Sequence, residues 1–202
     1  MTSDAATASE TDREVWERLR QRDPQALGVL FTRYVRDVHA FVVRRTGSYA
    51  VADDVVQATF VSAWRQFTRS DPGPLTRTTA RAWLITIAHN EVRNLARARR
   101  RLTRFVTSQP LPADQPDHAD AVADRIDSER RIDEVRTALH RLPRHERETV
   151  ELVYWAGLTI AETAGVLDVA PGTVKARLSR ARRRLPALLA ETAGSTETED
   201  QS

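Results

Sequence analysis

The sequence predicts an all-α protein made of two small helical domains joined by a flexible acidic linker. Apolar residues recur at spacings of three and four, the period of a helix with one buried face. Only 7 glycines occur among 202 residues that are rich in Ala, Leu, Arg and Glu, a composition that favours helices over strands. The period is lost over residues 105–128, where Pro and Asp replace large apolar side chains.

Changes in composition also place the domain boundaries. The start of the chain is small and polar, and its end is acidic and rich in Ser and Thr, so we expect both ends to be disordered. The expected parts are a disordered start at 1–11, a helical domain at 12–104, the linker at 105–128, a helical domain at 129–190 and an acidic disordered tail at 191–202.

The first domain should begin with a short amphipathic helix followed by a long one. Asp23 and Pro24 read as the N-cap and first residue of the long helix, and Gly47 should end it. Its apolar residues repeat at threes and fours, which predicts a buried face made of Leu27, Leu30, Phe31, Tyr34, Val38, Phe41 and Val42.

Two further helices are expected in this domain, over about residues 51–67 and 80–101. Residues 68–79 contain Pro and Gly and follow no helical or strand period, so they form a loop. A loop of that length is unusual in a compact helical domain, which favours a functional role for it.

The second domain should end in a helix-turn-helix over residues 158–185. A helix over about 145–155 comes first, after which Thr159 and Glu162 form a capping box. Asp168 turns the chain, and the next helix keeps its apolar residues, Val174, Leu178, Ala181 and Leu185, on one side. Because the opposite side is cationic, the motif is suited to entering a major groove.

Charge is segregated along the chain although its net value is only +3. Residues 81–104 hold seven Arg and one acid, and residues 171–186 hold one Lys and five Arg with no acid. An acidic segment at 113–130 separates them. Two cationic segments separated in this way indicate two contacts with a polyanion such as nucleic acid.

Several classes of site find no support in the residues. The chain has 0 Cys and 5 scattered His, so no metal-ligand spacing occurs and no cofactor is expected. No apolar run approaches the ~20 residues that span a bilayer, so we expect no membrane insertion and a cytoplasmic protein. No phosphate-binding Gly loop or catalytic constellation is present, which argues against an enzyme.

Three strings carry the first half of a resemblance: ALGVLFTRYVRDVHAFVVRRTG, ADDVVQATFVSAWRQF and RAWLITIAHNEVRNLARARRR. The second half is carried by LHRLPRHERETVELVYWAGLTIAETAGVLDVAPGTVKARLSRARRRL. In this order they resemble regions 2 and 4 of the extracytoplasmic-function (ECF) group of sigma-70 family transcription initiation factors. The resemblance implies core RNA polymerase, promoter DNA and an anti-sigma factor as partners.

For region 2 the resemblance implies two sets of contacts. The residues expected to dock on core polymerase are Asp53, Asp54, Gln57 and Phe60. Spacing alone would read the first two as acids favourable near a helix start. The residues expected to hold the melted −10 strand, together with the loop at 68–79, are Trp83, Asn90, Arg93, Asn94 and Arg97. For Trp83 a place in the core is an equal alternative.

For region 4 the resemblance implies reading of the −35 element as duplex by the second helix of the helix-turn-helix. The positions expected at base edges are Lys175, Ala176, Ser179 and Arg180, and those expected at phosphates are Thr173, Arg177 and Arg184. The chain departs from the family at Asn94, Asp168 and Ala170, where Asp, Gly and Ser are common; these differences bear on promoter sequence.

Two other functions would account for part of the sequence. A helix-turn-helix regulator that acts without polymerase would explain residues 158–185 but leave the first hundred residues without a role. A DNA-processing enzyme with an attached helix-turn-helix would need catalytic residues that no motif supplies.

Overall fold

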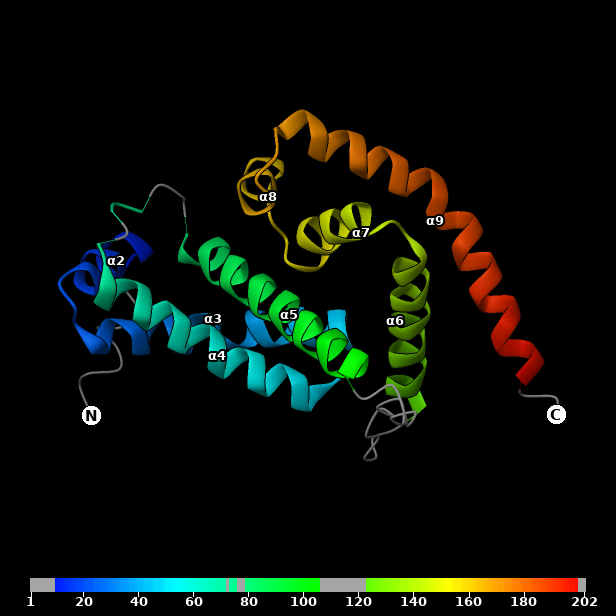
Figure 1. Ribbon diagram of the computed structural model, residues 1–202, viewed down its shortest axis with the longest axis horizontal. Helices are drawn as coiled ribbons and strands as arrows, with labels where there is room; N and C mark the ends of the chain where they lie inside the picture. The colour runs from blue at the N-terminus through cyan, green and yellow to red at the C-terminus, as the bar shows by residue number, and fades with distance from the viewer. Residues whose placement is uncertain (1–9, 72, 76–78, 106–122, 200–202) are drawn as a thin grey trace. The chain divides into compact units, whose positions relative to one another are not determined.

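In the computed structural model the chain forms two compact units, Met1–Gln115 and Pro116–Ser202. The structure describes residues 10–71, 73–75, 79–105 and 123–199. Every regular element among these residues is helical (Figure 1), which confirms the all-α prediction. Most of the expected linker lies outside the described residues.

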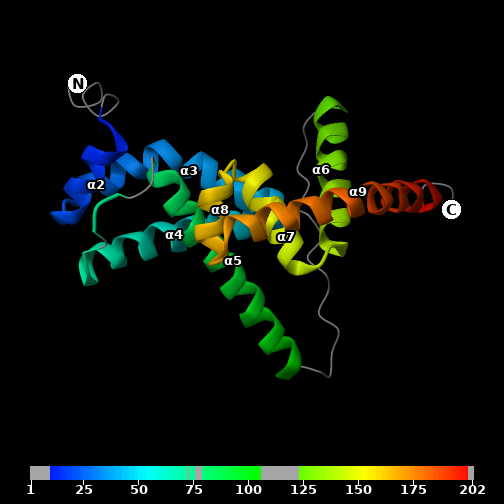
Figure 2. The same ribbon diagram turned by 90° about the horizontal axis from the view of Figure 1, so that it is seen from above.

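The first unit is built on a long central helix. Its elements are α2 (Asp12–Arg20), α3 (Pro24–Thr46), α4 (Tyr49–Arg69) and α5 (Ala80–Phe105). Helix α3 packs against the other three, and the core between them includes fully buried Leu30, Phe41 and Leu84. Figure 2 shows the second half of α5 running away from the α3–α4 pair, and residues 96–99 and 101 of that part are exposed.

Local chemistry fixes where these helices begin and end. The Asp23 side chain accepts the Gln25 N–H and Pro24 occupies the first turn of α3, as predicted. Gly47 ends α3 in the left-handed conformation at φ 71°, a conformation that costs glycine little. Ser48 then caps α4 by accepting the Val51 N–H.

Helix α2 holds the segment between α4 and α5 in place. The Trp16 Nε1–H donates to the Gly73 carbonyl at 2.9 Å, and the Trp16 ring packs edge-on against Phe67 and Trp83. The Arg20 guanidinium donates to both carboxylate oxygens of Asp71, from Nε to Oδ1 at 2.8 Å and from Nη2 to Oδ2 at 2.7 Å. Two described residues of the loop expected at 68–79, Asp71 and Gly73, are therefore held by side chains of α2.

One predicted core residue of α3 is wrong. Phe31 is 44% exposed, whereas Leu30 and Val38 are fully buried. The buried stripe of α3 runs through positions 26, 30, 34 and 38, and position 31 lies at its edge. The ring of Phe31 packs edge-on against Phe60 of α4 at 4.9 Å between centroids.

The second unit contains α6 (Ala123–Arg141), α7 (Arg144–Val150), a π-helical turn η1 (Glu151–Trp155), α8 (Ile160–Leu167) and α9 (Pro171–Glu199). Helix α9 contacts α6, α7 and α8. The core of the unit is formed by Leu139, Leu142, Val150 and Ala181, with Trp155, Leu178, Leu185 and Leu188 packed against it. The single helix predicted over about 145–155 thus changes to a wider π turn at its end.

The helix-turn-helix has the predicted caps. Thr159 and Glu162 form the capping box of α8, with the Thr159 Oγ1 accepting the Glu162 N–H at 3.2 Å. Asp168 ends α8 in the left-handed conformation at φ 52°, which Asp tolerates better than most residues. Val174 and Ala181 are fully buried, so the predicted inner face of α9 is confirmed.

Helix ends differ from expectation at two places. Helix α6 begins at Ala123, inside the segment expected to be linker. Helix α9 runs through Pro186 to Glu199, although a disordered tail was expected from residue 191. The Arg141 Nη2 donates to Glu191 at 2.5 Å, so part of that tail is tied to α6 by a contact that local composition does not reveal.

Candidate nucleic-acid interface

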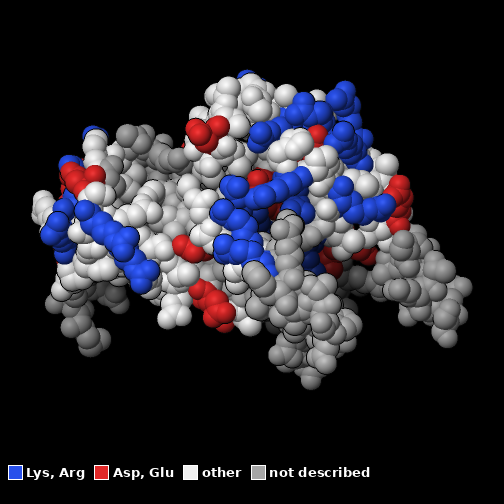
Figure 3. Space-filling model, viewed as in Figure 1, with Lys and Arg blue, Asp and Glu red and all other residues white. Residues whose placement is uncertain are grey.

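The cationic face of α9 is a broad surface with two flanks. The 100° rotation per residue places Ala176, Ser179 and Arg183 directly opposite the buried face, and all three are exposed. Lys175 is exposed on one flank. The predicted contact residues of the other flank are Thr173, Arg177, Arg180 and Arg184, of which only Arg184 is classed as exposed. Lys and Arg atoms gather over this helix in the space-filling view (Figure 3).

The second flank is tied to helix α7 through Glu146. The Arg180 Nε donates to Glu146 Oε1 at 3.1 Å, and the Arg184 Nη1 donates to Glu146 Oε2 at 2.9 Å. The carboxylate is 1% exposed, while the two arginine side chains are 41% and 50% exposed. The sequence pattern placed both arginines at the surface but did not indicate this shared acid.

In the first unit, α5 gathers the predicted polar residues on one face. Asn90, Asn94 and Arg97 are exposed and Arg93 is half-buried. The Arg97 Nη2 donates to Asn94 Oδ1 at 2.8 Å, so these two side chains are already associated. Trp83 lies apart from them, half-buried in the aromatic cluster with Trp16 and Phe67.

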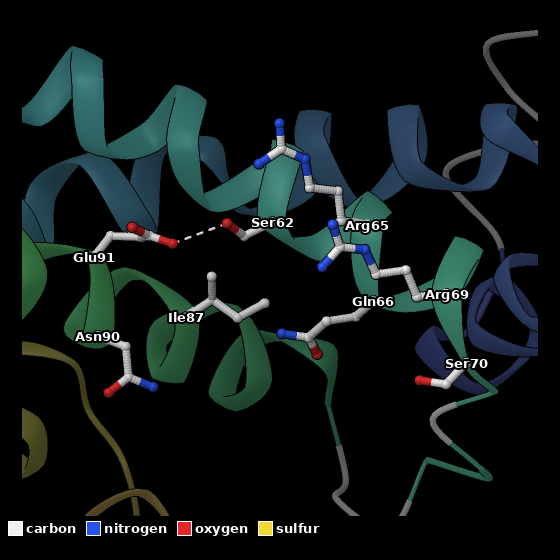
Figure 4. A pocket seen from close by; sticks show the side chains of 8 residues that line it. All are labelled: Ser62, Arg65, Gln66, Arg69, Ser70, Ile87, Asn90 and Glu91. Carbon is white, nitrogen blue, oxygen red and sulfur yellow. Dashed lines mark hydrogen bonds between the residues drawn. The ribbon is translucent and has the colours of Figure 1, made fainter.

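A polar pocket with a volume of about 380 Å³ lies between α4 and α5 (Figure 4). Figure 4 shows the hydrogen-bonded pair Ser62 and Glu91 near one end of the pocket and Ser70 at the other. The Ser62 Oγ donates to Glu91 Oε1 at 2.8 Å. The remaining lining residues are Arg65, Gln66, Arg69, Ile87 and Asn90. Of the individually predicted site residues Asn90 lines this pocket, and the expected loop at 68–79 contributes Arg69 and Ser70.

Apart from Arg69, which falls within the segment expected at 68–79, the contribution of α4 to this pocket was not predicted. The lining residues of α4, at positions 62, 65, 66 and 69, are spaced by three, one and three residues, so they form a polar stripe on one face of the helix. That period was available in the sequence. What it could not reveal is that the stripe faces α5.

The α3–α4 surface forms a separate and more apolar pocket with a volume of about 510 Å³. Exposed Asp53 and Gln57 border it, with Phe31 and His39 on the α3 side. Asp53 Oδ1 lies 3.3 Å from His39 Nε2. Asp54 is exposed as well, whereas Phe60 is only 6% exposed beneath Phe31.

No site for a bound metal is evident in the part of the chain that the structure describes, since no three His, Cys, Asp or Glu residues gather there as ligands would. Within the same residues, no helix is both long and apolar enough to cross a membrane.

Comparison with known proteins gives the class. The family described as Sigma-70 region 2 matches residues 30–102, and the family described as Sigma-70, region 4 matches residues 132–185. Together these matches cover more than half of the chain and coincide with the two structural units. The chain therefore belongs to the sigma-70 family, whose members are transcription initiation factors.

Individual relatives place it more narrowly. The ECF RNA polymerase sigma factor BldN of Streptomyces coelicolor is 31% identical over 187 residues, which are 89% of this chain and 66% of that protein. The ECF RNA polymerase sigma factor SigL of Mycobacterium tuberculosis is 34% identical over 169 residues, which are 79% of this chain and 89% of that protein. This similarity confirms the resemblance to the ECF group.

Two solved structures share the fold. CnrH in complex with the cytosolic domain of CnrY has a TM-score of 0.63 at 29% identity, over 90% of this chain and 99% of that one. The sigma factor RpoE in complex with the anti-sigma factor NepR from Bartonella quintana has a TM-score of 0.58 at 26% identity. The match covers 80% of this chain and 94% of that one.

Proposed function

We propose that this sigma factor binds core RNA polymerase and directs it to promoters by reading −35 duplex with α9 and holding melted −10 DNA on α5. The observation that carries the proposal is the presence of two cationic helices in separate units that match regions 2 and 4. The factor performs no chemistry of its own, because its work is recognition. It acts in the cytoplasm, where promoter DNA is found.

In the −35 contact, the exposed face of α9 enters the major groove. Lys175, Ala176, Ser179 and Arg180 face base edges, and Thr173, Arg177 and Arg184 hold phosphates. One bidentate arginine–guanine pair supplies about 1–3 kcal/mol of discrimination between bases. The phosphate contacts fix the register of the helix on the duplex.

In the −10 contact, the pocket between α4 and α5 takes a base flipped from the non-template strand. Its polar lining, with Asn90 and Gln66 as amide groups, suits the hydrogen-bonding edge of a base. Arg65 and Arg69 contact the DNA backbone, and these contacts offset the cost of a few kcal/mol for unstacking the base. Arg93, Asn94 and Arg97 continue this track along α5, and Trp83 supports the loop.

Core polymerase docks on the α3–α4 surface through Asp53, Asp54 and Gln57. Phe60 supports this surface from beneath by packing against Phe31. An anti-sigma factor is a further expected partner, by analogy with the RpoE–NepR complex. Such a partner would compete with polymerase.

The deciding experiment mixes the purified full chain with core RNA polymerase and fragmented genomic DNA and maps the transcription start sites. The proposal expects discrete starts that share upstream −10 and −35 sequences. Duplex binding without any affinity for core polymerase would instead identify a helix-turn-helix regulator. If the chain bound neither core polymerase nor duplex DNA, the assignments of both the polymerase surface and the DNA surfaces would be contradicted.

A further inference from the structure

Glu146 is a buried acid that joins the base-reading flank of α9 to a neighbouring helix. It lies in the first turn of α7, where its N–H donates to the Pro143 carbonyl at 2.9 Å. Its carboxylate is 1% exposed and receives Arg180 and Arg184, which are one helical turn apart on α9. His145 Nε2 lies 3.7 Å from one oxygen. Burying a carboxylate is costly unless it is paired, and here two arginines pair it.

The donor atoms used in this cluster determine which donors remain. Arg180 gives its Nε–H to Glu146, so both terminal Nη groups stay available as a fork. Arg184 gives Nη1 and keeps the edge formed by Nε and Nη2. A guanidinium held at one edge loses rotamer freedom before it meets DNA, and less entropy is then lost on binding.

We propose that Glu146 is a positioning residue for promoter recognition: it orients Arg180 towards a base and partly neutralises Arg180 and Arg184, so that sequence discrimination rises at the expense of non-specific phosphate binding. This inference rests on the proposed role of α9 as the −35 reader. Without Glu146, both arginines can contact phosphates of any DNA sequence, and the protein discriminates less between sequences.

The test is the substitution Glu146→Gln in the full chain assembled with core polymerase. Affinity is measured for a promoter duplex with its mapped −35 sequence and for the same duplex with that sequence scrambled, over a series of salt concentrations. Gln keeps the shape but lacks the charge and offers one acceptor in place of two. We expect the ratio of specific to scrambled affinity to fall about tenfold, the size of one lost bidentate reading. We also expect the slope of log affinity against log salt for the scrambled duplex to steepen by about 1.

Glu151→Gln is the matched control. Glu151 is also fully buried, and its ion pair at 3.6 Å is with Arg147 of α7, four residues earlier in the chain. This variant should lose stability and keep the discrimination ratio and the salt slope of the parent. If Glu146→Gln also keeps both, Glu146 serves only the fold and the proposal is overturned. A parent holoenzyme that does not distinguish the two duplexes would instead overturn the −35 role of α9.

A second set of variants remains informative if Glu146→Gln folds poorly. In the double variant Arg180→Ala/Arg184→Ala the acid is left buried without its two arginines, which is strongly destabilising. Adding Glu146→Gln to that background should raise the thermal midpoint and leave discrimination unchanged, because the arginines it positions are gone. A further fall in discrimination in the triple variant would contradict positioning through Arg180 and Arg184.

Discussion

Asp12 and Ala80 are joined by a hydrogen bond across 68 positions of the chain: the Asp12 Oδ2 accepts the Ala80 N–H at 2.6 Å. The first amides of a helix have no partner within the helix, and α5 obtains one from the start of α2. The same buried carboxylate accepts the Tyr34 hydroxyl and pairs with Arg33. One side chain thus fixes the beginning of α5, the helix that carries the proposed −10 contact residues.

Asp12→Ala should therefore destabilise the first unit markedly. The change leaves the Ala80 N–H, the Tyr34 hydroxyl and the Arg33 guanidinium without their common acceptor, at a cost of about 3 kcal/mol. Urea denaturation followed by tryptophan fluorescence measures the loss. The matched control is Asp37→Ala, which removes a partly exposed ion pair with Arg81 and should cost less than about 1 kcal/mol. Equal losses in the two variants would contradict a special role for Asp12.

Asp71 should titrate at unusually low pH. The hydrogen bond from Arg20, helped by the Gly73 N–H, lowers the pKa of Asp71 from 3.8 to about 2. Because the folded-state pKa is depressed, the stability contributed by this group is present above about pH 3.8 and is lost as the pH falls through about 2. The carboxyl carbon shift of Asp71 in a pH titration by NMR gives the midpoint directly.

Arg20→Ala should raise that midpoint towards 3.8, with the remaining shift due to Gly73. Arg18→Ala is its control, because Arg18 pairs with Asp23 and not with Asp71. A midpoint for Asp71 that does not respond to Arg20→Ala would show that the α2–loop contact does not form in solution.

Several helix ends were predictable because the capping chemistry is local, unlike the start of α6 and the end of α9. Asp23 and Pro24, Gly47 and the Thr159–Glu162 box act on backbone groups a few residues away, and the structure has each of them as expected. Asp168 likewise adopts the left-handed turn from its own conformational tolerance.

The sites were less predictable because they depend on contacts between distant helices. Arg65 and Arg69 become pocket residues only when α4 faces α5, and Glu146 becomes a partner of Arg180 only when α7 packs on α9. Phe31 illustrates the opposite failure: its helical spacing predicted a core residue, but it lies at the edge of the buried stripe and is exposed. Periodicity identifies a face but not what covers it.

Phe31 and Phe60 should respond differently to truncation although their rings touch. Phe31 is exposed beside Asp53 and Gln57, so Phe31→Ala should weaken binding to core polymerase by about 1–3 kcal/mol with little change in stability. Phe60 is nearly buried, so Phe60→Ala should cost about 3–5 kcal/mol of stability. Holoenzyme assembly by fluorescence anisotropy and urea denaturation separate the two effects. A loss of stability in the Phe31 variant comparable with that in the Phe60 variant would remove the reason to regard Phe31 as a docking residue.

Arg69 offers a sharp test of the pocket between α4 and α5, because it lines the pocket from the end of α4, opposite the predicted contact residues of α5. If this pocket holds the melted strand, Arg69→Ala removes one phosphate contact and should reduce the salt slope for a single-stranded −10 oligonucleotide by about 0.7. Affinity should fall for every sequence tested, because a guanidinium at the pocket rim contacts phosphates. Asn90→Ala should instead lower affinity chiefly for the preferred base, because an amide forms hydrogen bonds with a base edge. Arg13→Ala is the matched control: it removes an exposed arginine of the same unit that does not line the pocket. Equal effects of Arg13→Ala and Arg69→Ala would mean that the strand responds to the overall charge of the unit, and the base pocket would then have to be sought elsewhere on α5.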